Sequence, residues 1–129
     1  MSATAEDRML ALSIHFGVPI DQIEERDRYG LGDEPSYRVE GQPGAYSVLT
    51  DDEANEIWEA CLDSYLDDCI LPKLPEFARS YFDEEAWKRD ARYDGRGYSI
   101  NSYDGDEHEV RMPDSCECSE RWLYVYRVD

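Results

Sequence analysis

Basic residues are scarce in this chain, and lysine is nearly absent. Among 129 residues there are 13 Lys and Arg against 31 Asp and Glu, which gives a formal net charge of −18 at pH 7. Lys73 and Lys88 are the two lysines. A protein of this charge is repelled by nucleic acid and by anionic membranes and is attracted to basic surfaces. We therefore expect a basic protein partner, with no direct binding to nucleic acid or to a membrane.

Long apolar runs are lacking as well. The sequence has no stretch of about 18 apolar residues that would span a bilayer, and residues 1–20 have no signal-peptide pattern. A hydrophobic content of 41% favours a folded chain over a disordered one. We expect a cytoplasmic protein with a single domain over 1–129. Its three parts are an N-terminal helix and hairpin (1–49), an acidic helical segment (50–93) and C-terminal strands (94–129).

Recognisable catalytic motifs are also missing. The chain has no nucleophile elbow and no P-loop, and Gly95-Arg96-Gly97 is too short for a dinucleotide fingerprint. A thiol–imidazole pair of Cys116 and His108 would lie among acids, which disfavour a thiolate. We predict no enzyme, no catalytic residue and no cofactor. A small metal-dependent hydrolase that uses His108 and the acids around it is the catalytic alternative.

The four cysteines lack the spacing of common zinc sites. Cys61 and Cys69 are eight residues apart, and one residue separates Cys116 from Cys118. Disulfides are rare in the cytoplasm, so we interpret the four as thiols and leave a four-cysteine zinc site open. The acids at 104–109 lack the spacing of a calcium loop, and a solvated hairpin tip explains them more simply. The prediction is that no metal is bound.

Helix and strand signals alternate along the chain. Thr4 and Gly17 bound a helix over 5–16, and a short helical turn follows at 18–23. A loop is expected at 26–35, a hairpin from 37–40 and 46–49, and short helices at 76–82 and 83–89. A second hairpin is expected from 98–103 and 108–111, a polar loop at 113–120, and a central apolar strand at 122–128. The order predicts an α+β fold, in which an antiparallel sheet of about four to five strands has several helices packed mainly on one face.

The segment 50–69 gives the strongest helix signal and the highest density of charge. Thr50 and Glu53 form a capping box at its start. Apolar residues recur at helical spacing and should face the core: Ala54, Ile57, Trp58, Cys61, Leu62, Tyr65 and Cys69. From 51 to 69 there are eight acids and no base. The opposite face should therefore present a row of carboxylates to solvent: Asp52, Glu56, Glu59, Asp63 and Asp67.

This acidic row is the candidate partner-binding surface. Asp52 to Asp67 would span roughly 22 Å of helix, over which one DNA strand presents about six or seven phosphates. A protein that binds phosphates could bind these carboxylates instead. With neighbouring acids, the candidate residues are Asp52, Glu56, Glu59, Asp63, Asp67, Asp68, Glu84 and Glu85. Alternatively, the row is a solvated helix face, and the bulk charge reflects salt adaptation or a GC-rich genome.

Several short segments together resemble one family. They are MLAL at 9–12, HFGV at 15–18, YSVLTDDEA at 46–54, DGRG at 94–97, SYDG at 102–105 and YVYR at 124–127. In these segments the chain resembles small acidic proteins of bacteriophages and metagenomic sequences, and segment 68–92 fits that group least. The resemblance implies a phage context, in which small acidic proteins recur as inhibitors of host nucleases, and several anti-CRISPR and anti-restriction proteins imitate DNA.

By this analogy we expect an inhibitor of a host-defence complex that binds nucleic acid. Its partner would be a CRISPR effector or a restriction enzyme in the host cytoplasm, and the acidic surface would act as a DNA mimic. The alternative is an acidic, non-catalytic protein-binding regulator whose charge reflects solubility or salt adaptation. The sequence does not specify an oligomeric state.

Overall fold

A five-stranded antiparallel sheet, with strand order β1-β2-β3-β5-β4, forms the base of the molecule. The computed structural model describes residues 4–32, 34–101, 103–113 and 121–128. The strands are β1 Ile23–Tyr29, β2 Pro35–Val39, β3 Tyr46–Leu49, β4 His108–Arg111 and β5 Trp122–Arg127. The α+β class is confirmed, and the apolar C-terminal strand lies between β3 and β4 as its sequence predicts.

Side-chain alternation along β3 and β5 divides the core between the two faces of the sheet. Tyr46 pairs with Arg127 and Leu49 with Tyr124, so the strands run in register along their whole shared length. Val48 and Val125 belong to one buried cluster, whereas Leu49 and Tyr126 belong to a second cluster on the opposite face. Both faces of β5 are therefore buried, which explains its nearly continuous apolar sequence.

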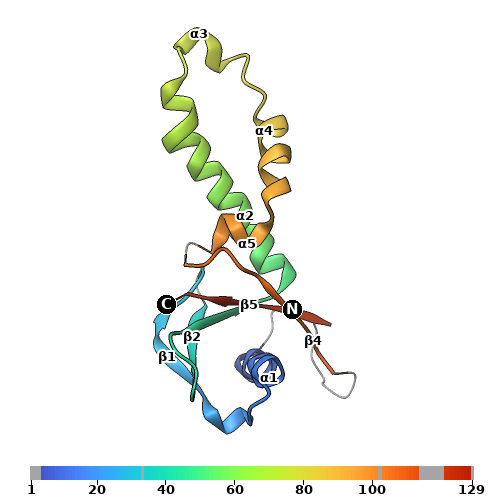
Figure 1. Cartoon of the computed structure of the whole chain (residues 1–129). Helices are drawn as coiled ribbons and strands as arrows, with labels where there is room; N and C mark the ends of the chain where they lie inside the picture. The colour runs from blue at the N-terminus through green and yellow to red at the C-terminus, as the bar shows by residue number, and fades with distance from the viewer. Residues whose placement is uncertain (1–3, 33, 102, 114–120, 129) are drawn as a thin grey trace.

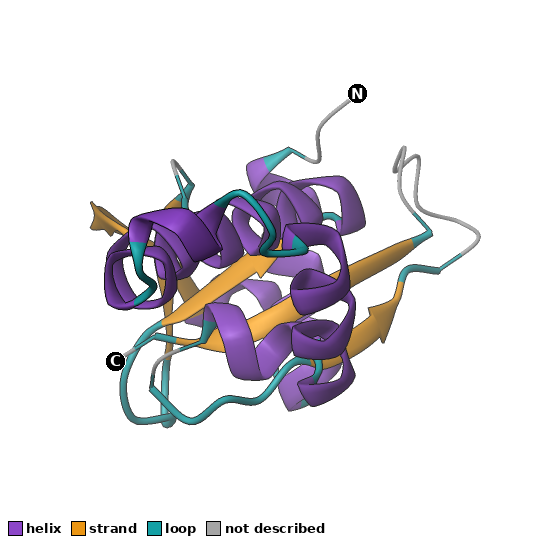
Figure 2. Ribbon diagram, turned by 90° about the horizontal axis from the view of Figure 1, so that it is seen from above, coloured by secondary structure: helices purple, strands orange, loops and turns teal. Residues whose placement is uncertain are grey.

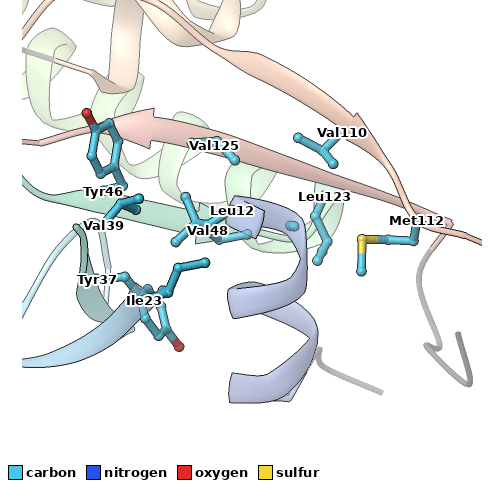
Figure 3. Close-up of a cluster of buried hydrophobic side chains, with 11 residues drawn as sticks. Leu12, Ile23, Tyr37, Val39, Tyr46, Val48, Val110, Met112, Leu123 and Val125 are labelled. Atoms are coloured by element: carbon cyan, nitrogen blue, oxygen red, sulfur yellow. The ribbon is translucent and has the colours of Figure 1, made fainter. Parts of the chain in front are cut away.

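Helix α1 (Ala5–Phe16) covers the first face. The Thr4 hydroxyl accepts a hydrogen bond from the backbone N–H of Asp7, and Gly17 ends the helix with a positive φ of 68°. Ala11 and Leu12 are fully buried. Figure 3 shows the cluster around Leu12, to which all five strands and Met112 after β4 contribute: Ile23, Tyr37, Val39, Tyr46, Val48, Val110, Met112, Leu123 and Val125.

Helix α2 (Asp51–Tyr65) rises from the opposite face. Its first turn has the predicted capping box of Thr50 and Glu53, and Ala54 packs with Leu49, Ile100 and Tyr126. The helix continues as a π-helical turn, Leu66–Ile70, so the predicted helical run to residue 69 is confirmed with altered geometry in its last turn. With α1 alone on the other face, the helices pack mainly on one face of the sheet (Figures 1 and 2).

The segment 51–95 projects from the sheet as an arm. After the π-helical turn come the 3-10 turn Leu71–Lys73, α3 (Glu76–Arg79), α4 (Glu84–Ala91) and the 3-10 turn Arg92–Asp94. Figure 1 shows α3 at the tip and α4 returning beside α2 toward α5 (Arg96–Ile100) at the base. Within residues 63–95, as far as burial is described there, Leu66 is the one fully buried side chain. The outer arm therefore has little core of its own.

Two sequence predictions are wrong. The expected strand at 98–103 is helix α5 over Arg96–Ile100, and β4 pairs with β5 instead of with that segment. Gly97 faces the backbone before β4, where an added Cβ would lie 2.8 Å from the Cβ of Glu107. The expected loop at 26–35 is also wrong in part, because β1 runs to Tyr29 and β2 starts at Pro35. Most of the predicted polar loop at 113–120 lies outside the described residues.

Candidate functional site

All eight candidate acids lie on the arm. Asp52, Glu56, Glu59 and Asp63 are on α2, Asp67 and Asp68 are on the π-helical turn, and Glu84 and Glu85 begin α4. Seven of these side chains are exposed, and Glu59 is partly buried. The structure therefore brings residues from two separate sequence segments onto one projecting element.

Helix α4 supplies bases to two of these acids. Lys88 Nζ lies 2.5 Å from Asp63 Oδ1 and 3.4 Å from Glu59 Oε2, and Arg92 also pairs with Glu59. The carboxylate of Asp63, followed by that of Glu59, raises the pKa of Lys88 above its ordinary value. Segment 51–69 contains no base of its own, but these two bases from a later segment neutralise the row at Glu59 and Asp63.

The other six acids keep their charge uncompensated at short range. None of them takes part in an ion pair among residues whose placement is described: Asp52, Glu56, Asp67, Asp68, Glu84 and Glu85. We call Asp52 and Glu56 on α2 the proximal group, and the four acids on the π-helical turn and at the start of α4 the distal group. These carboxylates are available to accept hydrogen bonds from the Lys and Arg side chains of a partner.

Arg96 fixes the base of the arm. Its Nη1 lies 2.8 Å from both Asp51 Oδ1 and Asn55 Oδ1, and its Nε lies 2.6 Å from Glu107 Oε1. Burial by itself lowers the pKa of Arg96, but the hydrogen bonds with Glu107 and Asp51 outweigh it and raise the pKa. The guanidinium also lies 4.5 Å from the ring centre of Tyr124 on the sheet. These contacts join α2, α5, the segment before β4, and β5.

Glu107 joins the same network from its other side. The buried hydroxyl of Tyr126 donates a short hydrogen bond to Glu107. Burial, followed by the hydrogen bond to Glu107, raises the pKa of Tyr126 well above its ordinary value. The arm thus leaves the sheet from a base held by several hydrogen bonds, whereas its outer part buries few side chains.

A cavity of about 590 Å³ lies between α2, α4 and α5. Its lining residues include the aromatic residues Tyr65, Trp87 and Tyr98, together with Ile70 and Asp90. The rings of Tyr65 and Trp87 stack at 5.7 Å with an angle of 10° between their planes. We name this feature the arm groove. The sequence analysis missed this groove because it assigned all the apolar residues of segment 50–69, including Tyr65, to the core. In the structure Tyr65 is exposed.

The other chemical candidates stay separate. Cys61 and Cys69 are free thiols, and burial raises the pKa of Cys61, so this thiol is not activated. Cys116 and Cys118 lie outside the described residues. His15 and His108 have ring centres 5.0 Å apart, but no group of three or more His, Cys, Asp or Glu that could hold a metal occurs in the described part of the chain.

Within the same described part, no helix is both long enough and apolar enough to cross a membrane. Comparisons with protein-family models, with curated proteins and with solved structures return no match for this chain. The resemblance to acidic phage proteins stays an expectation.

Proposed function

We propose that this protein is a non-enzymatic inhibitor that binds the basic, nucleic-acid-binding surface of a partner protein. The observation that supports this proposal best is the projecting arm, on which six exposed carboxylates have no ion-pair partner among the residues that the structure describes. The resemblance adds the expectation that the chain is phage-encoded and that the partner is a host-defence complex, such as a CRISPR effector or a restriction enzyme.

Charge and shape both favour binding in place of nucleic acid. A projecting element can enter a cleft that normally holds a duplex, and a net charge of −18 speeds the encounter with a basic surface. The neutral cluster of Glu59, Asp63, Lys88 and Arg92 interrupts the row. The mimicry we propose therefore uses the proximal and distal groups of acids as two clusters, rather than one continuous line of phosphate substitutes.

Exposed aromatic side chains on the arm favour a second candidate function. Phe77 and Tyr81 near the tip are 75% and 87% exposed, and Tyr93 is 82% exposed. Aromatic residues at this exposure are typical of protein-binding surfaces and have no counterpart in a DNA mimic. An acidic regulator whose partner binds the aromatic tip without using a nucleic-acid site is therefore the alternative. Competition by DNA distinguishes the two functions.

The structure selects the variants for the test. Glu59 and Asp63 are unsuitable because their reversal would place positive charge against Lys88 and Arg92. Reversal of Glu56 and Asp67 (E56K with D67K) changes one acid of each cluster, and both positions are exposed. The matched control reverses Glu40 and Glu109 (E40K with E109K), two exposed acids at the sheet, so that both variants carry the same net charge.

The assay measures phage plating on CRISPR-immune bacteria that express each variant, together with capture of the effector on immobilised protein. We expect wild type and the E40K/E109K variant to restore plating and to release the captured effector when duplex DNA is added. The E56K/D67K variant should lose both effects while its circular dichroism spectrum is unchanged. If duplex DNA does not release the captured effector, the result would instead support the alternative function, an acidic regulator that binds outside the nucleic-acid site.

A further inference from the structure

The arm groove combines aromatic walls with an acid that has no cationic partner. Tyr65 on α2, Trp87 on α4 and Tyr98 on α5 line it together with Asp90, an exposed residue of α4. Within the described part of the chain, Asp90 takes part in no ion pair or side-chain hydrogen bond. The volume of about 590 Å³ lies in the range of ligand pockets.

Three bases near the groove are already engaged, and Arg89, the residue before Asp90, is exposed to solvent. Lys88 pairs with Glu59 and Asp63, Arg92 pairs with Glu59, and Arg96 pairs with Asp51 and Glu107. Two of these bases also lie over rings, Arg92 at 5.9 Å from the Trp58 centre and Arg96 at 4.5 Å from the Tyr124 centre. Guanidinium groups thus already lie over aromatic rings at two places in and beside the arm. The aromatic residues of the groove could accept a further guanidinium from outside the chain.

A cation is the ligand that this chemistry favours. The face of an aromatic ring attracts Arg and Lys, and Arg stacks on it with its planar guanidinium. A carboxylate beside the rings adds a charge-assisted hydrogen bond. The charge of the chain disfavours two other occupants, because an anionic ligand and a second copy that also carries −18 would both be repelled.

We propose that the arm groove binds an arginine side chain from a segment of the basic partner protein. The guanidinium lies against the rings of Trp87 and Tyr98 and donates to the carboxylate of Asp90, while apolar neighbours in the segment contact Ile70 and Cys61. This inference rests on the proposed function and adds the feature by which the partner is recognised. The exposed acids attract the partner over a distance, and the groove selects an arginine at contact.

The test is an NMR titration with a short alanine peptide that carries two arginines, because this method detects weak binding. We expect the indole N–H signal of Trp87 to shift together with the backbone amides of Ala91 and Ser99. The signal of Trp122, at the start of β5, should stay in place and serves as the internal control. Shifts spread over the acidic residues without a change at Trp87 would overturn the proposal, since they indicate diffuse charge attraction.

Two further comparisons separate charge from recognition. The same peptide with citrulline in place of arginine keeps the shape and loses the charge, so it should bind at least about tenfold more weakly. The Asp90→Asn variant should weaken binding of the arginine peptide by about tenfold, as expected for one lost charge-assisted hydrogen bond. The matched control Glu76→Gln changes an exposed acid on α3, outside both the groove and the candidate acids, and should alter binding less than about twofold. Equal effects of the two variants would also overturn the proposal.

Failure of the groove and failure of the proposed function give different results. If Asp90→Asn inhibits the effector normally while the E56K/D67K variant does not, the acidic surface acts without the groove. If Asp90→Asn loses inhibition while E56K/D67K retains it, the groove is the binding site and DNA mimicry is wrong.

Discussion

Arg8 links the helices on the two faces of the sheet. Its side chain is buried, with 1% of the residue exposed. From α1, Nη1 donates to the carbonyl oxygen of Val48 at 2.5 Å, and the guanidinium binds both carboxylate oxygens of Glu53 at 2.9 and 3.0 Å. Glu34 lies 3.4 Å away. Glu53 therefore belongs to the structure of the molecule, although it lies within the acidic run of the sequence.

Removal of this guanidinium should destabilise the fold strongly. Arg8→Met leaves Glu53 partly buried without its cation, and the loss of one partner of such a pair costs about 3–5 kcal/mol. The free energy of unfolding from urea titration measures the effect. The control Arg38→Met, at an exposed position of β2, should cost less than about 0.5 kcal/mol. Similar losses for both variants would contradict the role given to Arg8.

The Glu53 carboxylate should make stability depend on pH. Burial alone would raise its pKa, but the hydrogen bonds from Arg8 and from the backbone N–H of Thr50 outweigh burial and lower the pKa below 4.5. A carboxyl whose pKa is lowered in the folded state stabilises the fold above its unfolded pKa, and this contribution disappears as the pH falls through the folded pKa. The stability difference between wild type and Glu53→Gln should thus be largest near pH 7 and shrink below pH 4.5. Urea titrations at several pH values measure it, and a constant difference would contradict the assignment.

Among the helices and strands, the sequence correctly predicted the features that depend on contacts within a few residues, such as helix caps. Thr4, Gly17 and Thr50 set helix boundaries through backbone hydrogen bonds within a few residues, and all three are found where expected. The strand at 98–103 was wrong because a five-residue helix has too few residues to show its period. Gly97 and Ile100 are its buried positions, and glycine carries no apolar signal. β1 was missed because its sequence, IEERDRY, is mostly charged and forms an edge strand.

The candidate site could be predicted only in part, for a related reason. The helical spacing of the acids on α2 was readable from the sequence. Their pairing with Lys88 and Arg92 was not, because the chain must reverse at the tip of the arm before these bases face Glu59 and Asp63. The arm groove depends on the same reversal, since Tyr65 and Trp87 meet across two helices.

The arm should open more readily than the sheet. Its outer half buries Leu66 alone among the side chains whose burial is described, whereas β5 is buried on both faces. Few buried contacts lower the free energy of local opening. Backbone amides of α4 should therefore exchange with deuterium at least about tenfold faster than those of β5, as measured by mass spectrometry. Saturation with the arginine peptide should slow exchange in α4 and leave β5 unchanged. Equal protection of α4 and β5 in the free protein would contradict this picture of the arm.

For the whole molecule, the net charge of −18 acts on folding and on binding in opposite directions. Self-repulsion among 31 acids destabilises the compact state, and salt screens it, since the Debye length falls from about 10 Å at 0.1 M to about 3 Å at 1 M. The melting temperature should therefore rise as NaCl is added from 0.05 to about 0.5 M. Across the same range, affinity for the basic partner should fall, because the same screening weakens the attraction between them. Calorimetry and binding measured on one salt series, with sucrose at matched osmolality as the control, test both signs. If the melting temperature rises while the affinity stays unchanged, the acidic charge does not contribute to binding of the partner. That result would indicate that the acidity is an adaptation to salt.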